Sequence, residues 1–83
     1  MSAINHPAAN CSTNARNSEI AAAIVAVIES EGDLPTSWAL TRAGFNVDHP
    51  ERDRARDVLH SLCEMGVLEL KRWEKGRVYV GQL

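Results

Sequence analysis

The spacing of apolar residues changes twice along this chain, first to a helical period and then to a period of two. Residues 1–17 are rich in Asn, Ala and Ser without a sustained period, which predicts a flexible N-terminal tail. Such a tail could still order against a partner. A helical period begins at Ser18 and predicts a first helix over about residues 18–31, ended by Gly32. Its apolar face consists of Ile20, Ile24, Val27 and Ile28.

Two more helices are predicted between residues 36 and 65. A connector over 33–35 leads to a short helix that Thr36 or Ser37 caps and Gly44 ends, and we expect its Trp38 to lie in the core. The motif Asp48-His49-Pro50-Glu51 resembles a capping box with Pro in the first turn, which predicts that the third helix starts there. Gly66 ends this helix, whose apolar face consists of Ala55, Val58, Leu59, Leu62 and Met65.

The last third of the chain predicts a β-hairpin. Alternating segments over 67–73 and 77–83 flank the loop 74–76, in which Gly76 supplies a left-handed conformation. Pairing Trp73 with Arg77 places Lys71 opposite Tyr79 and puts two sets of side chains on opposite faces. The core face is Leu68, Leu70, Val78 and Val80, and the outer face is Glu69, Lys71, Trp73, Arg77 and Tyr79. We expect the most buried side chains to be Ile24, Val27, Ile28, Leu40, Leu59, Leu62 and Leu70.

The order of these elements resembles that of the winged helix-turn-helix superfamily. Residues 55–80 are similar to its recognition helix and wing, with Val58-Leu59 and Leu62 as the apolar positions, Gly66 as the helix end and 74–76 as the charged tip. The resemblance covers about residues 18–83 and implies one α+β domain of three helices followed by a C-terminal hairpin, the wing. In such regulators the third helix enters the major groove and the wing touches phosphate or the minor groove.

Charge is unevenly distributed, although the net charge of the 83 residues is only −2. Residues 1–48 carry two basic residues against five acidic ones, and residues 49–83 carry seven against six. A nucleic-acid-binding domain usually has a clear basic patch and a high isoelectric point. The near-neutral balance therefore counts against DNA as the partner.

The solvent face of the third helix is mixed in sign. Helical projection places Asp53, Asp57, His60, Ser61 and Glu64 opposite the apolar face, with Arg54 and Arg56 on its flanks. Carboxylates on this face are repelled by phosphates, except where one accepts from a cytosine amine. The alternative is a solvated face with ion pairs such as Asp53 with Arg56.

The hairpin is the more basic surface. Four basic residues surround two aromatic ones there, an arrangement that suits phosphate and minor-groove contacts, a protein interface, or simply coverage of the hairpin's outer face. We expect the wing to carry more binding free energy than the third helix. The candidate nucleic-acid or partner-binding residues are Arg52, Arg54, Arg56, His60, Lys71, Arg72, Trp73, Lys75, Arg77 and Tyr79.

The sequence predicts neither an enzyme nor a cofactor or metal site. Asp57 and His60 are spaced as a base and its orienting group, but no oxyanion-binding group is identifiable beside them. His60 and Cys63 are spaced like metal ligands, with only His49, His6 or Cys11 to complete a site and no second ligand pair. No Gly-rich phosphate loop is present.

The expected compartment is the cytoplasm. Two cysteines, Cys11 and Cys63, make no disulfide framework and are expected to be free thiols. No run of 18 apolar residues predicts a membrane span, and the N-terminus lacks the pattern of a signal peptide.

Two functions follow from this pattern. The leading expectation is a small protein that binds double-stranded DNA as a transcriptional regulator. The alternative is a protein-interaction module on the same fold, an adaptor or inhibitor that docks on a larger nucleic-acid-processing complex. A homodimer is compatible with either function.

Overall fold

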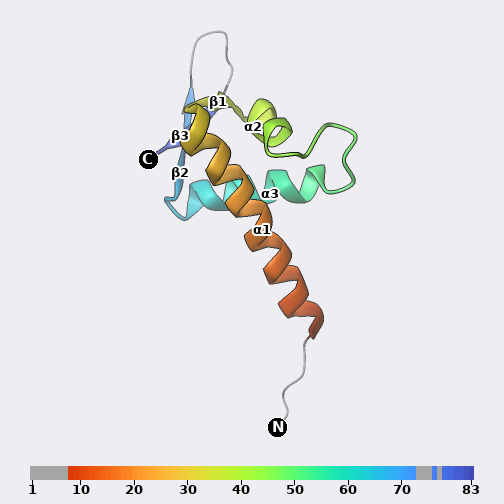
Figure 1. The fold of residues 1–83 in the computed structure, drawn as a ribbon. Helices are drawn as coiled ribbons and strands as arrows, with labels where there is room; N and C mark the ends of the chain where they lie inside the picture. The colour runs from red at the N-terminus through yellow and green to blue at the C-terminus, as the bar shows by residue number, and fades with distance from the viewer. Residues whose placement is uncertain (1–7, 73–75, 77) are drawn as a thin grey trace.

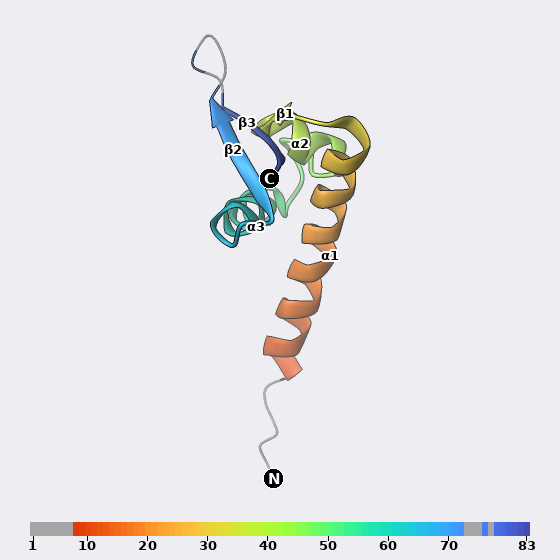
Figure 2. The ribbon, with the colours of Figure 1, turned by 90° about the vertical axis from the view of Figure 1, so that its left-hand side faces the viewer.

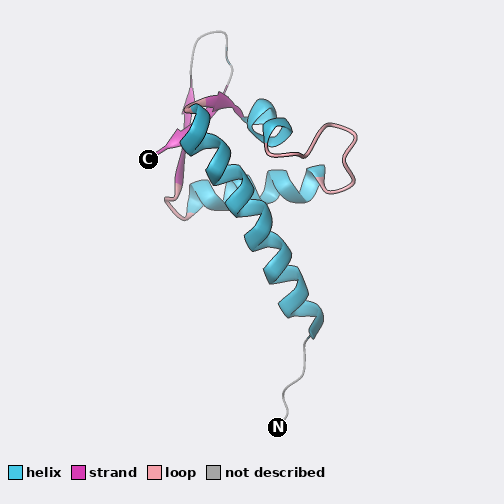
Figure 3. Ribbon diagram, viewed as in Figure 1, coloured by secondary structure: helices cyan, strands magenta, loops and turns pink. Residues whose placement is uncertain are grey.

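The computed structural model describes residues 8–72, 76 and 78–83 and has an α+β fold (Figure 1). The order of elements is α1 (Ala8–Glu31), β1 (Leu34–Pro35), α2 (Thr36–Arg42), α3 (Arg52–Glu64), β2 (Leu68–Arg72) and β3 (Val78–Gln82). The strands form one antiparallel sheet beside the helices, and α1 crosses α3 (Figure 3).

The first helix begins ten residues earlier than the sequence pattern predicted. α1 starts at Ala8, so the predicted start at residue 18 is wrong, and residues 8–17 of the predicted tail are helical. This segment contains neither Gly nor Pro and is rich in alanine, which has the highest helix propensity. A periodic pattern of apolar residues arises where a helix packs against a core. The N-terminal part of α1 extends past the rest of the fold (Figure 2), so its sequence shows no such pattern. Residues 1–7 of the predicted tail lie outside the described residues.

The connector 33–35 contributes a strand that the sequence pattern did not predict. β1 pairs with β3, with Leu34 opposite Val80 and Pro35 opposite Tyr79, and the strand order is β1-β3-β2. Proline cannot donate a backbone hydrogen bond, and its place in an edge strand is therefore tolerated. Two residues are too few for a period-two pattern to be visible.

The register predicted for the hairpin is confirmed. Lys71 lies opposite Tyr79, Leu70 lies opposite Val80, and Gly76 has a φ of 72°. Leu68 and Val80 are fully buried, but Leu70 is 41% exposed, so its predicted place in the core is wrong. β2 is an edge strand whereas β3 is central, and Leu70 therefore has strand neighbours on one side only.

Most of the predicted core is confirmed. Ile24, Ile28, Leu40, Leu59 and Leu62 are buried, together with Ile20 and Phe45, which were not among the residues predicted to be most buried. Val27 is only half-buried.

Two further apolar predictions are wrong, because Trp38 is 57% exposed and Met65 is 69% exposed. The short α2 buries a narrow stripe that Ala39 and Leu40 fill, which leaves Trp38 outside. Met65 follows α3 as its C-cap residue, where the helical face ends.

Candidate functional site

An ion-pair cluster joins α1 to the start of α3. Arg16 Nε donates to Glu51 Oε2 at 2.9 Å, and its Nη2 forms an ion pair with Glu51 Oε1. Arg16 Nη1 also contacts Glu19 Oε1 at 2.9 Å. The hydrogen bonds from Arg16 lower the pKa of Glu51, and those to Glu51 and then Glu19 raise the pKa of Arg16. Glu51 is thus engaged across the helix interface.

The capping box predicted at Asp48–Glu51 is wrong. α3 begins at Arg52, four residues after Asp48, with Glu51 as N-cap residue and no side-chain capping hydrogen bond. His49 acts at this end instead, because its Nδ1 accepts a hydrogen bond from the Glu51 backbone N–H at 3.0 Å. The contact requires the neutral imidazole with an unprotonated Nδ1.

Aromatic and guanidinium groups fix the loop between α2 and α3. The rings of Phe45 and His49 meet edge to face, with centroids 5.1 Å apart. The Arg16 guanidinium lies over the Phe45 ring, 5.9 Å from its centroid. Arg52 Nη1 donates to the Phe45 carbonyl at 2.6 Å and to Thr41 Oγ1 at 3.1 Å. Arg52, a predicted binding residue, therefore has a structural role within the protein.

The exposed face of α3 is mixed in sign, as the helical projection predicted. Arg56 Nη2 contacts Asp53 Oδ1 at 3.0 Å, which is the predicted ion pair. Arg54 donates to Asn17 Oδ1 on α1 at a marginal 3.5 Å. Asp57, His60 and Glu64 are exposed. A phosphate that approaches α3 would therefore meet several carboxylates. Among the described residues, Arg54 has only the 3.5 Å contact with Asn17, whereas Arg52 and Arg56 have closer acceptors.

The base of the hairpin holds the remaining described candidates. Lys71 Nζ contacts Asp33 Oδ2 at 3.3 Å, an ion pair between β2 and the residue before β1. Tyr79 is half-buried on the same outer face, opposite both Lys71 and Pro35. Arg72 pairs through its backbone with Val78. The predicted contacts of Trp73, Lys75 and Arg77 lie outside the described residues.

The Asp33 carboxylate occupies space that only glycine leaves open. Gly81 is buried in β3, and a Cβ placed on it would lie 1.8 Å from Asp33 Oδ1. The carboxylate therefore rests directly over the strand backbone while it contacts Lys71. The sequence pattern alone gave no signal of this arrangement, because Asp33 and Gly81 are far apart along the chain.

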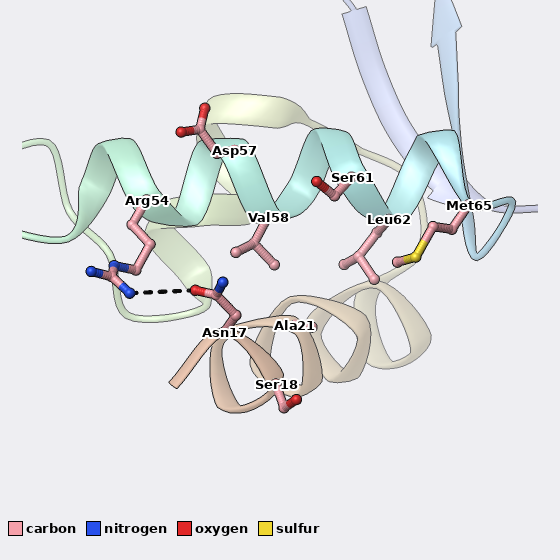
Figure 4. A pocket seen from close by; sticks show the side chains of 9 residues that line it. All are labelled: Asn17, Ser18, Ala21, Arg54, Asp57, Val58, Ser61, Leu62 and Met65. Atoms are coloured by element: carbon pink, nitrogen blue, oxygen red, sulfur yellow. Dashed lines mark hydrogen bonds between the residues drawn. The ribbon is translucent and has the colours of Figure 1, made fainter. Parts of the chain in front are cut away.

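A groove between α1 and α3 has a volume of about 620 Å³ (Figure 4). Val58 and Leu62 of α3 point toward α1, and Asn17 and Ala21 face them from α1. The full lining is Asn17, Ser18, Ala21, Arg54, Asp57, Val58, Ser61, Leu62 and Met65. Among these, only Arg54 was a predicted binding residue.

No cluster of three or more potential metal ligands occurs among the described residues. Cys63 is a half-buried free thiol, and burial raises its pKa, which lowers its reactivity at neutral pH. In the described range, no helix is long and apolar enough to span a bilayer.

In comparisons with known proteins, no protein family, no curated protein and no solved structure matches the chain.

Proposed function

We propose that this chain is a winged helix-turn-helix protein that binds double-stranded DNA, as a small transcriptional regulator, mainly through its β2–β3 hairpin. The observation that carries the proposal is the order of elements, α1-β1-α2-α3-β2-β3, with strand order β1-β3-β2. The short β1 strengthens it, since it supplies a third strand of the sheet from which the hairpin extends. The hairpin is then the wing.

The distribution of basic residues favours the hairpin over α3 as the main contact. On α3, Arg52 bonds a backbone carbonyl and Arg56 is paired with Asp53. The hairpin sequence carries Lys71, Arg72, Lys75 and Arg77 against Glu69 and Glu74. Phosphate contacts release counterions in proportion to the number of cations involved, and the hairpin sequence has an excess of basic residues that α3 lacks, so the wing is expected to provide most of the affinity.

A protein-interaction module on the same fold is the second candidate, and a specific observation favours it. Five of the six described lysine and arginine side chains already have a close acceptor within the protein: Arg16, Arg42, Arg52, Arg56 and Lys71. The sixth, Arg54, makes only the 3.5 Å contact with Asn17. Large apolar side chains are also exposed, among them Trp38 and Val47, which is 75% exposed. Exposed aromatic residues are common at protein interfaces.

Binding to a mixed-sequence DNA duplex across a salt series tests the proposal. Fluorescence anisotropy should show an affinity that falls linearly in log–log form as salt rises. Lys75→Ala or Arg77→Ala should weaken all sequences similarly and reduce the salt slope by about one unit each. Arg54→Ala is the matched control on α3 and should change sequence preference more than the slope.

A substitution that is expected to raise DNA affinity makes this test sharper. Asp33→Asn removes the charge that holds Lys71 and should raise DNA affinity, because Lys71 then becomes available to phosphate. If no duplex binds at low salt, the DNA proposal is wrong and the interaction module takes its place. In that case Trp73→Ala should weaken capture of the protein partner by about 2 kcal/mol or more, with little salt dependence.

A further inference from the structure

We propose that the groove between α1 and α3 is filled by residues 8–15 of a second copy of this chain, so that the protein forms a symmetric dimer. Two observations meet at this place. The groove has an apolar floor that is open to solvent, and the helix that forms one of its walls continues beyond the domain. This proposal does not depend on whether the protein binds DNA.

The projecting part of α1 supplies the occupant. Both views of the fold show the N-terminal part of α1 extending past α3 (Figures 1 and 2). The described side chains of α1 begin at Ala15, which is exposed, and Arg16 contacts Glu51. A helical segment of this length is marginal in water without packing, so a surface that covers it would stabilise it.

The groove matches this segment in length, and the segment carries no charge. From Arg54 to Met65 it follows α3 for about 16 Å at 1.5 Å per residue, and residues 8–15 form a helix about 12 Å long. The segment AANCSTNA has small residues and no charge. Its neutrality suits a floor of Ala21, Val58 and Leu62, whose rim carries one positive residue, Arg54, and one negative residue, Asp57.

Symmetry allows both grooves to be filled at once. If two α1 helices cross near residue 16, with each helix inclined along α3 of the other copy, residues 8–15 of each copy lie along the groove of the other. That position is adjacent to Asn17, Ser18 and Ala21, which form the α1 side of the groove. The interface is then isologous, with the same segment and the same groove used by both copies.

The buried area is sufficient for a weak dimer. One side of an eight-residue helix has about 260 Å² of accessible surface, so two segments and two grooves bury about 1,000 Å² in total. This reaches the lower limit of a specific interface. Met65, which is 69% exposed at one end of the groove, would be covered. We therefore expect a dissociation constant in the micromolar range, on the order of 10 µM.

Sedimentation equilibrium of the full chain from about 1 to about 500 µM tests the proposal. We expect a monomer–dimer equilibrium. Met65→Glu places a charge at the groove and should raise the dissociation constant by about tenfold or more. Val47→Glu is the matched control, because Val47 is exposed to a similar degree but lies outside the groove, and it should change the constant by less than about twofold. Circular dichroism should show all three proteins to be folded.

Ala15→Glu tests the segment instead of the groove. Ala15 is exposed on α1, and a carboxylate there should weaken the dimer while leaving the monomer folded. A chain that stays monomeric at the highest concentration overturns the proposal. So does a dimer that neither Met65→Glu nor Ala15→Glu weakens, since its interface would then lie elsewhere, for example at the exposed Leu70.

Discussion

The apolar interior and the ion pairs at its two ends hold this protein together in different ways. In the interior, Ile20, Ile24, Leu59 and Val80 are all fully buried. At the ends, Arg16 with Glu51 and Asp33 with Lys71 join elements that are 35 and 38 residues apart and remain partly exposed. Exposed pairs contribute little free energy, because water already solvates both charges.

The interior and the ion pairs therefore contribute differently to the structure. Buried apolar area carries most of the free energy of folding. The ion pairs fix side-chain positions. One holds the Glu51 carboxylate against Arg16, and Glu51 makes no side-chain capping hydrogen bond at α3. The other holds the Lys71 ammonium against Asp33. Substitutions in the interior should consequently change stability, and those in the ion pairs should mainly change geometry, pH dependence and ligand binding.

The largest effect is expected for Leu59→Ala in the interior. Leu59 is fully buried on α3, and removing its methyl groups leaves a cavity that the surrounding core fills only partly. The expected loss is about 2–5 kcal/mol, a large part of the stability of a domain this size. Chemical denaturation measures it. Val47→Ala, at an exposed apolar site outside the interior, is the control and should cost less than about 0.5 kcal/mol.

A smaller effect on stability is expected for Gly81→Ala, and its sign should differ between the native and the Asp33→Ala backgrounds. The added Cβ displaces the Asp33 carboxylate and breaks its contact with Lys71, so the expected cost is about 1 kcal/mol. In an Asp33→Ala background the obstruction is gone, and the same substitution should stabilise by about 0.5 kcal/mol because alanine restricts the unfolded chain. A double-mutant cycle by thermal unfolding measures both steps. Equal effects in the two backgrounds would show that Asp33 does not rest on β3.

The smallest effect is expected for Glu51→Gln, and it depends on pH. The folded pKa of Glu51 lies below its ordinary value of 4.5 because Arg16 donates hydrogen bonds to it. Its contribution to stability is therefore fully present above pH 4.5 and is lost as the pH falls through the folded pKa. The difference in unfolding midpoint between the native protein and E51Q should shrink as the pH is lowered through this window.

Glu64→Gln provides the control for this titration. Glu64 is exposed on the same helix and has no ion pair within the described residues. This substitution should change the unfolding midpoint little, because exposed side chains without an ion pair contribute little to stability. An E51Q protein that loses stability in acid as steeply as the native chain would mean that the contact with Arg16 is not maintained in solution.

The sequence by itself determined the three helices, the hairpin and its register. These features depend on local period and on glycines at particular positions, such as Gly66 after α3 and Gly76 in the hairpin loop. It also determined most of the interior and the ion pair between Asp53 and Arg56, because residues three apart on a helix are neighbours whatever the rest of the chain does.

Only the tertiary structure decided the contacts between distant segments. Burial of Trp38 and Leu70 depended on which neighbour covers a short helix or an edge strand. The Glu51 carboxylate beside the start of α3 is bound by Arg16, which lies 35 positions away on α1. The α1–α3 groove and the Asp33 carboxylate over Gly81 likewise combine residues with no local relation. Local propensity and periodicity act over a few residues, whereas these features depend on how the elements pack in space, and no pattern in the sequence records that directly.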